Sequence, residues 1–198
     1  MKFKAGKCRV FISFSFFAAA IIMITTGKSE AYFRILYFAF FHELGHTAVL
    51  FVFGYKILSV SLTAFGARLE CERFDDADCF TKALVWLSGA FVNLLFVGAF
   101  SVIGGYENEV TNNLFLALFN LLPYYGFDGH NALVCITEEL SANRKTVHTV
   151  KHISSITVVL VFTSLNIFLI FVKKPDLMLI FMNFYLIFGL LGYLKADE

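Results

Sequence analysis

The chain has 198 residues, of which 59% are hydrophobic and 16% charged, with a formal net charge of +1 and a mean hydropathy of +0.75. This composition is too apolar for a water-soluble domain of this size, and it predicts a polytopic membrane protein. A charge so close to zero argues against the basic surface that nucleic-acid binding requires. We expect residues 1–198 to form a single membrane-embedded domain, without a PDZ domain or a regulatory domain.

Six apolar runs with little or no charge predict about six transmembrane helices, because about 20 apolar residues are needed to cross roughly 30 Å of hydrocarbon. The first run follows four basic residues, as in a signal peptide, but it lacks a small-residue cleavage site and is expected to remain as an anchor. The expected spans are 10–26, 31–53, 83–103, 110–125, 153–172 and 177–194. The predicted fold class is therefore all-α.

The distribution of Lys and Arg predicts the orientation of these spans. The N-terminal tail and the segments 54–82 and 127–152 carry most of these residues, and basic segments favour the cytoplasmic side. Six spans leave both termini on the same side. We therefore expect a multi-pass protein of the cell membrane with both termini in the cytoplasm.

The sequence His42-Glu43-Leu44-Gly45-His46 lies inside the second apolar run. On a helix, imidazoles four residues apart share one face and can bind one zinc ion, while Glu43 can reach a water molecule on that ion. Titratable groups within a span are costly to bury, so a compensating role is expected of them. Such a pattern would occur by chance in about one of two hundred shuffled chains. It predicts a zinc hydrolase site within the bilayer.

Between the second and third runs the apolar residues alternate with polar ones. The alternation over Ile57 to Thr63 and over Ala67 to Glu72, with Gly66 at the turn, predicts a β-hairpin at about 57–72. An open strand edge beside a membrane active site can hold an extended substrate by strand addition. The alternative is a plain amphipathic surface hairpin.

A catalytic zinc ion needs a third protein ligand, and Asp128 is the best candidate. Pro123 and Gly126 break the fourth span just before this carboxylate. Broken backbone at membrane depth is tolerated only where it is buried in protein or lines a wet cavity, which is where a metal site would lie. The alternative is that Asp128 caps a helix that begins near Asn131.

Three motifs in this order resemble those of the site-2 proteases, which are intramembrane zinc metalloproteases. They are the pentad 42–46, Gly89-x-x-x-Asn93, and Asn120-x-x-Pro123 followed by Asp128-Gly129. The compact form resembles the branch that contains the sporulation protease acting on a membrane-tethered sigma-factor precursor. The resemblance implies one zinc ion per chain, held by His42, His46 and Asp128, with Glu43 as the general base.

The chain also departs from this family. Members usually continue the aspartate motif with a second glycine and often place a proline shortly before it, whereas Gly126 and His130 stand in those neighbourhoods here. His130 could line the site or compete with Asp128 for the metal, and a free imidazole beside a metal is more often a supporting group than a ligand.

Substrate positioning is the predicted role of Asn93 and Asn120. The carbonyls of a helical substrate are engaged in its own hydrogen bonds, so a transmembrane substrate must be unwound before cleavage, and these amides could hold the unwound strand. The alternative is hydrogen bonding between helices or, for Asn120, termination of a helix ahead of Pro123.

Other titratable groups are given structural roles. His148 and His152 also have i, i+4 spacing and are expected to be solvated histidines at the membrane edge, with an accessory metal or a pH-sensitive contact as the alternative. Glu138 and Glu139 are possible zinc ligands, but a solvated polar face is favoured. The cysteines lack metal or disulfide spacing; they are Cys8, Cys71, Cys79 and Cys135.

These observations predict an intramembrane zinc endopeptidase. Its expected partners are the lipid bilayer, a membrane protein substrate such as a transcription-factor precursor or an anti-sigma factor, and a regulatory membrane partner. A divalent-metal transporter and a catalytically inactive membrane scaffold are the alternatives. Glu43 discriminates between them, because neither alternative needs a carboxylate directly after a ligand histidine.

Overall fold

The computed structural model describes residues 2–5, 8–25, 27, 29–63, 66–141 and 143–196. These residues are mainly helical, as predicted, and they include one small sheet. They form two compact units, Met1–Phe119 and Asn120–Glu198. The first unit contains β1 (Lys2–Ala5), β2 (Cys8–Ile12), α1 (Phe14–Thr25), α2 (Ser29–Val52), β3 (Ile57–Thr63), β4 (Gly66–Cys71), the 3-10 helix η1 (Phe74–Asp76), α3 (Cys79–Ile103) and α4 (Glu107–Asn120). The last residue of α4, Asn120, is the first residue of the second unit.

Three helices in the described part of the chain are long and apolar enough to cross a membrane. Their candidate spans are Tyr32–Val52 in α2, Cys79–Ile103 in α3 and Arg144–Phe171 in α6, and a shorter apolar helix covers Leu179–Lys195. Many large apolar side chains on these helices are exposed, including Phe91 and Phe168, and such surface is stable only against lipid or another protein. The chain is a membrane protein.

Two of the six expected spans differ from the structure. The first, 10–26, is wrong at its start, because residues 10–12 belong to β2, which leaves α1 with only 12 helical residues, about 18 Å of helix. The fourth, 110–125, is wrong at its end, because α4 stops at Asn120. Pro123 lacks an N–H and disfavours helix at the residue before it. The count of six therefore stays a prediction.

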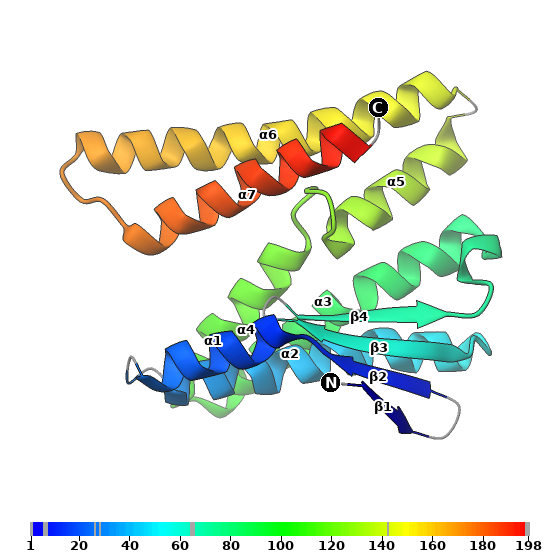
Figure 1. Ribbon diagram of the computed structural model, residues 1–198, viewed down its shortest axis with the longest axis horizontal. Coiled ribbons are helices and arrows are strands. Elements are labelled where there is room, and N and C mark those ends of the chain that lie inside the picture. The colour runs from blue at the N-terminus through cyan, green and yellow to red at the C-terminus, as the bar shows by residue number, and fades with distance from the viewer. Residues whose placement is uncertain are drawn as a thin grey trace. The chain divides into compact units, whose positions relative to one another are not determined.

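The hairpin predicted at 57–72 is confirmed, although residues 64 and 65 of its turn lie outside the described residues. β3 pairs with β4 in antiparallel register from Ile57 opposite Cys71 to Thr63 opposite Gly66. The strands lie side by side in the order β1-β2-β3-β4 (Figure 1), and β2 runs parallel to β3. The N-terminal segment thus covers one edge of the hairpin, and β4 is the outer strand on the other side of the sheet.

The two faces of β3 are not divided as its alternation suggests. Ser59 is buried and donates a hydrogen bond of 2.5 Å from its hydroxyl to the Glu70 carboxylate, whereas Leu58 is exposed. A register irregularity between residues 57 and 59 accompanies this change. A bulge of this kind re-aims the side chains that follow it.

The second unit contains α5 (Asp128–Leu140), α6 (Arg144–Phe171) and α7 (Leu177–Ala196). α6 and α7 pack along one another as an antiparallel pair (Figure 1). The Tyr124 side chain lies in the core beside α7 and donates a hydrogen bond of 2.7 Å to the Leu186 carbonyl. This contact attaches the irregular segment before α5 to the helical pair.

Candidate metal centre

Two imidazoles from α2 meet in the interior of the first unit. His42 and His46 are four residues apart on the helix, and their Nε2 atoms are 3.2 Å apart. Both side chains are buried, with 4% and 6% of their surface exposed. Two zinc–nitrogen bonds of about 2.05 Å at a tetrahedral angle would place their nitrogens about 3.3 Å apart. The spacing of the pair therefore suits one tetrahedral ion.

Two glycines allow α3 to approach this pair. A Cβ atom at Gly89 would lie 2.5 Å from the Nε2 atom of His46 and 2.6 Å from that of His42. On the facing helix, a Cβ atom at Gly45 would lie 2.8 Å from the Ser88 carbonyl oxygen. Small residues at such positions let helix backbones come close together in membrane proteins. The Gly within the pentad and the Gly of Gly89-x-x-x-Asn93 thus serve the same helix contact.

A chain of hydrogen bonds fixes the protonation of His42. Its Nδ1 atom lies 2.6 Å from Asn93 Oδ1, the Asn93 Nδ2 group donates to Asn113 Oδ1 at 2.9 Å, and the Asn113 Nδ2 group donates to the Glu109 carbonyl at 2.8 Å. A carbonyl oxygen can only accept, so it orients both amides in turn. His42 Nδ1 must therefore carry the proton, and neutral His42 has its lone pair on Nε2.

His46 is fixed in the same way by a shorter path. Its Nδ1 atom lies 2.7 Å from the backbone carbonyl oxygen of Val85, which requires a proton on Nδ1. When both rings are neutral, the two Nε2 atoms therefore face each other with their lone pairs. Such an arrangement is repulsive unless a cation lies beside both nitrogens, so this donor set fits a metal ion.

The Asn93 side chain is bound to other side chains of the protein, whereas a residue that positions substrate would need a free amide. Its side chain is fully buried, and its amide is engaged at both ends, by His42 and by Asn113. Interhelical hydrogen bonding, the alternative for this residue, describes these contacts. Asn120 ends α4, at the position expected if it terminates a helix ahead of Pro123. A role of either amide toward substrate stays a prediction.

Replacing Asn93 by Ala is expected to weaken zinc binding about 10- to 100-fold, because His42 loses the group that orients its ring and holds its Nδ1 proton. The measurement is a zinc titration of the purified protein against a competing chelator. Asn166→Ala is a matched control, since Asn166 is also buried but donates to backbone carbonyls of the second unit, those of Phe162 and Leu179. Equal zinc affinity of the Asn93→Ala variant and the wild type would contradict the orienting role.

Asp128 opens α5 in the second unit. The helix begins at Asp128 itself, and the N-cap position belongs to Phe127, which makes no side-chain cap bond. The alternative in which Asp128 caps a helix starting near Asn131 is therefore wrong. A carboxylate in the first turn of a helix is stabilised by the helix dipole. Glu43, beside His42 on α2, is partly buried.

His130 is buried in the second unit beneath α6. Its Nδ1 atom lies 3.4 Å from the Ser154 hydroxyl, and its Nε2 atom has no hydrogen-bond partner among the described residues. Burial, more than any other cause, lowers the pKa of this imidazole, so it is neutral near pH 7. Competition between His130 and Asp128 for a metal stays a prediction.

Of the remaining polar groups, His148, Glu138 and Glu139 have the exposed surroundings expected of them. His152 differs, because its ring packs against Tyr193 with the centroids 5.3 Å apart. His148 is exposed at the start of α6, with its ring centroid 4.1 Å from that of the partly exposed His152. Glu138 and Glu139 are both exposed at the end of α5, as a solvated polar face requires. None of these residues belongs to the first unit, where the buried imidazole pair lies.

Comparison with known proteins gives relatives of one kind. No protein-family model matches the chain. It is 31% identical over 118 residues to a candidate zinc metalloprotease of Synechocystis sp., and 28% identical over 122 residues to stage IV sporulation protein FB of Bacillus subtilis. These matches cover 52% and 58% of this chain, but only 30% and 42% of the two relatives. The chain thus matches less than half the length of either relative.

The fold is similar to that of a solved structure along nearly the whole chain. The site-2 protease from Methanocaldococcus jannaschii superposes with a TM-score of 0.68, over 97% of this chain and 94% of that structure, at 18% identity. In its fold, and in the relatives that its sequence matches, the chain resembles the site-2 proteases. The resemblance of the three sequence motifs to this family is confirmed, and so is the expected similarity to its sporulation branch.

Proposed function

We propose that this protein is an intramembrane zinc endopeptidase of the site-2 type that cleaves a membrane protein by regulated intramembrane proteolysis. The observation that carries the proposal is the buried pair of Nε2 lone pairs, 3.2 Å apart, within a candidate membrane span. Hydrogen bonds from the Nδ1 atoms, to the Asn93 amide and to the Val85 carbonyl, place the proton of each neutral ring on Nδ1, so that both Nε2 atoms offer a lone pair. A purely structural role would not require two imidazoles whose Nε2 lone pairs face each other.

His42, His46 and Asp128 are the proposed zinc ligands, with one zinc ion per chain. Asp128 is supported by its sequence context, an Asp-Gly pair directly after a segment broken by Pro123, and by its place in the first turn of α5. When bound, zinc acts as a Lewis acid that activates a water molecule and polarises the carbonyl under attack.

Glu43 is the proposed general base. It follows His42 directly on α2, so its carboxylate can take the proton of the attacking water and then give it to the leaving amine nitrogen. Its position within an apolar helix keeps the surroundings poor in water, which strengthens this proton transfer. The proton transfer therefore needs the Glu43 carboxylate itself, while the two imidazoles of α2 serve as metal ligands.

The proposed substrate is a transmembrane or membrane-tethered protein, such as a transcription-factor precursor or an anti-sigma factor. Since its helix must unwind before cleavage, β4 is a candidate support for the extended strand, because it is the outer strand of the sheet on the side away from β2. Asn120 is a further candidate holder. We propose a multi-pass arrangement with cytoplasmic termini and access gated by a regulatory membrane partner.

Replacing Asp128 by Ala is expected to reduce zinc content from one ion per chain to less than one tenth, since two imidazoles alone hold zinc weakly against a chelator. The measurement is metal analysis after dialysis against a competing chelator. Asp176→Ala is the matched control, because Asp176 accepts a hydrogen bond from the Leu179 N–H at the start of α7. Full zinc occupancy of the Asp128→Ala variant would exclude the aspartate as a ligand.

The activity is tested by cleavage of a single-span reporter protein reconstituted with the enzyme in liposomes. We expect zinc chelation to stop cleavage and added zinc to restore it. Zinc flux across the same liposomes without cleavage would favour the transporter instead. Retention of the reporter without either cleavage or flux would favour the inactive scaffold.

A further inference from the structure

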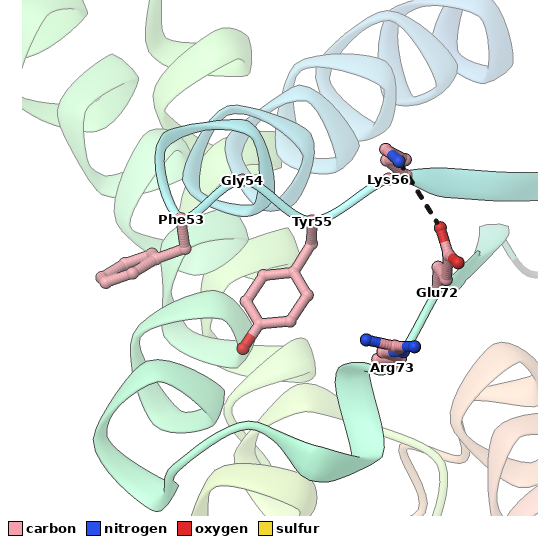
Figure 2. A pocket seen from close by; sticks show the side chains of 6 residues that line it. All are labelled: Phe53, Gly54, Tyr55, Lys56, Glu72 and Arg73. Atoms are coloured by element: carbon pink, nitrogen blue, oxygen red, sulfur yellow. Dashed lines mark ion pairs between the residues drawn. The ribbon is translucent and has the colours of Figure 1, made fainter.

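A pocket of about 330 Å³ lies in the first unit where the hairpin joins the membrane helices. It is lined by Phe53, Gly54, Tyr55, Lys56, Glu72 and Arg73 (Figure 2). The candidate span of α2 ends at Val52, and that of α3 begins at Cys79. The pocket therefore lies just beyond the end of α2, at the depth of the lipid headgroups.

Backbone contacts build this pocket and hold its two sides together. The Glu72 N–H donates to the Lys56 carbonyl at 2.9 Å, and the Tyr55 N–H donates to the Leu50 carbonyl at 2.9 Å. The Tyr55 ring also packs edge-on against Phe74, with the centroids 5.7 Å apart. The lining is thus attached both to the end of α2 and to the start of η1.

The charges of the lining favour an anion. Lys56 and Glu72 form an ion pair of 4.0 Å whose side chains are 80% and 49% exposed, and such a pair contributes little. Figure 2 shows Glu72 between Lys56 and Arg73. Arg73 makes no ion pair within the part of the chain that the structure describes. Two cations and one anion leave the lining with a charge of +1.

The backbone of Arg73 supports a role for its side chain. Arg73 has a φ of 56°, in the left-handed region, where an ordinary side chain costs roughly 1 kcal/mol more than glycine. Backbone of this kind is retained where the surrounding structure or the function requires it. Glycine would adopt this backbone conformation at a lower free energy. An arginine at this position is therefore explained by its guanidinium group.

We propose that this pocket binds the phosphodiester headgroup of an anionic phospholipid. Arg73 and Lys56 would bind the phosphate oxygens, since guanidinium and ammonium groups are the usual protein donors to phosphate. Phe53 and Tyr55 would lie at the boundary between headgroups and acyl chains, where aromatic rings are enriched. Basic pockets beside transmembrane helices bind anionic lipids in this manner. This proposal does not depend on the proposed protease activity.

The test is native mass spectrometry of the full-length detergent-solubilised protein titrated with phosphatidylglycerol or with zwitterionic phosphatidylcholine. We expect one phosphatidylglycerol per chain, bound at least tenfold more tightly than phosphatidylcholine. In the Lys56→Gln/Arg73→Gln variant the affinity should fall about 25-fold, about fivefold for each cation. The matched control, Arg144→Gln/Lys145→Gln, removes two exposed cations of α6 and should retain the wild-type affinity.

The Glu72→Gln substitution is expected to raise the affinity for phosphatidylglycerol, whereas a loss of folding could only lower it. Removal of this carboxylate takes away a negative charge that repels the lipid phosphate, and it releases Lys56 from its ion pair. Phosphatidylglycerol should therefore bind several-fold more tightly. Equal affinity of the wild type and the Lys56→Gln/Arg73→Gln variant would overturn the proposal. So would an equal loss in the α6 control, which indicates diffuse charge attraction, or displacement of the lipid by equimolar inorganic phosphate, which indicates a site for the free ion.

Discussion

Replacing Glu43 by Gln is expected to reduce peptide cleavage at least 10³-fold while one zinc ion per chain remains bound. Gln has nearly the same shape as Glu but cannot accept the proton of the attacking water, and general-base catalysis contributes about 10²- to 10⁴-fold. The zinc ligands proposed here do not include Glu43. The measurement combines the single-turnover cleavage rate of the reconstituted reporter protein with metal analysis of the same sample.

Glu30→Gln provides the matched control for this experiment. Glu30 lies on the same helix, but it is exposed and pairs with Arg34 at 2.6 Å, four residues along α2. The same chemical change at this position should leave cleavage within about twofold of the wild type, because exposed ion pairs contribute little. Wild-type cleavage by the Glu43→Gln variant would exclude the proposed mechanism, and loss of zinc from that variant would assign Glu43 a structural part instead.

The imidazole pair could be predicted from the sequence because its geometry is local. A helix places residues i and i+4 on one face whatever lies around it, so the spacing of His42 and His46 was sufficient. The hairpin at 57–72 was also predictable, since alternation with a period of two is local information. Both features needed only a short window of sequence.

The groups that prepare the imidazoles come from other helices and could not be assigned from the sequence. The Val85 carbonyl belongs to the backbone of α3, and every residue type has such a carbonyl, so the residue type at position 85 does not indicate this contact. Asn113 on α4 offered no signal, since its partner Asn93 is 20 residues away. Gly89-x-x-x-Asn93 was recognised as a motif, but its two functions, helix approach and ring orientation, depend on the packing of α2 against α3.

The error at the first span has a similar origin. Val10 to Ile12 are apolar, and hydropathy alone does not separate an apolar strand from the start of a membrane helix. The parallel pairing of β2 with β3, Arg9 opposite Ser59 and Ile12 opposite Leu62, decides the matter. The paired residues are 50 positions apart in the sequence, so no local pattern predicts the pairing.

Replacing Gly89 by Ala is expected to weaken zinc binding at least 10²-fold and to abolish cleavage. The new methyl group would lie 2.5 to 2.7 Å from three ring atoms of His46 and His42, so either α3 must move away or the imidazoles must turn. Overpacking of this kind costs about 1–3 kcal/mol of folding free energy, and a shift of about 1 Å in a catalytic group can cost about 10²-fold in rate. Zinc titration against a chelator and the reporter assay measure the two effects.

Gly98→Ala separates this prediction from a general intolerance of α3 to substitution. Gly98 lies on the same helix, and a Cβ atom there would meet nothing within 4 Å. Alanine also favours helix over glycine by about 1 kcal/mol, so this variant should be at least as stable as the wild type, with unchanged zinc affinity. If Gly89→Ala also kept both zinc and activity, then the close approach of α3 to the imidazole pair would not be needed, and the Asn93 and Val85 contacts would have to form at a wider helix spacing.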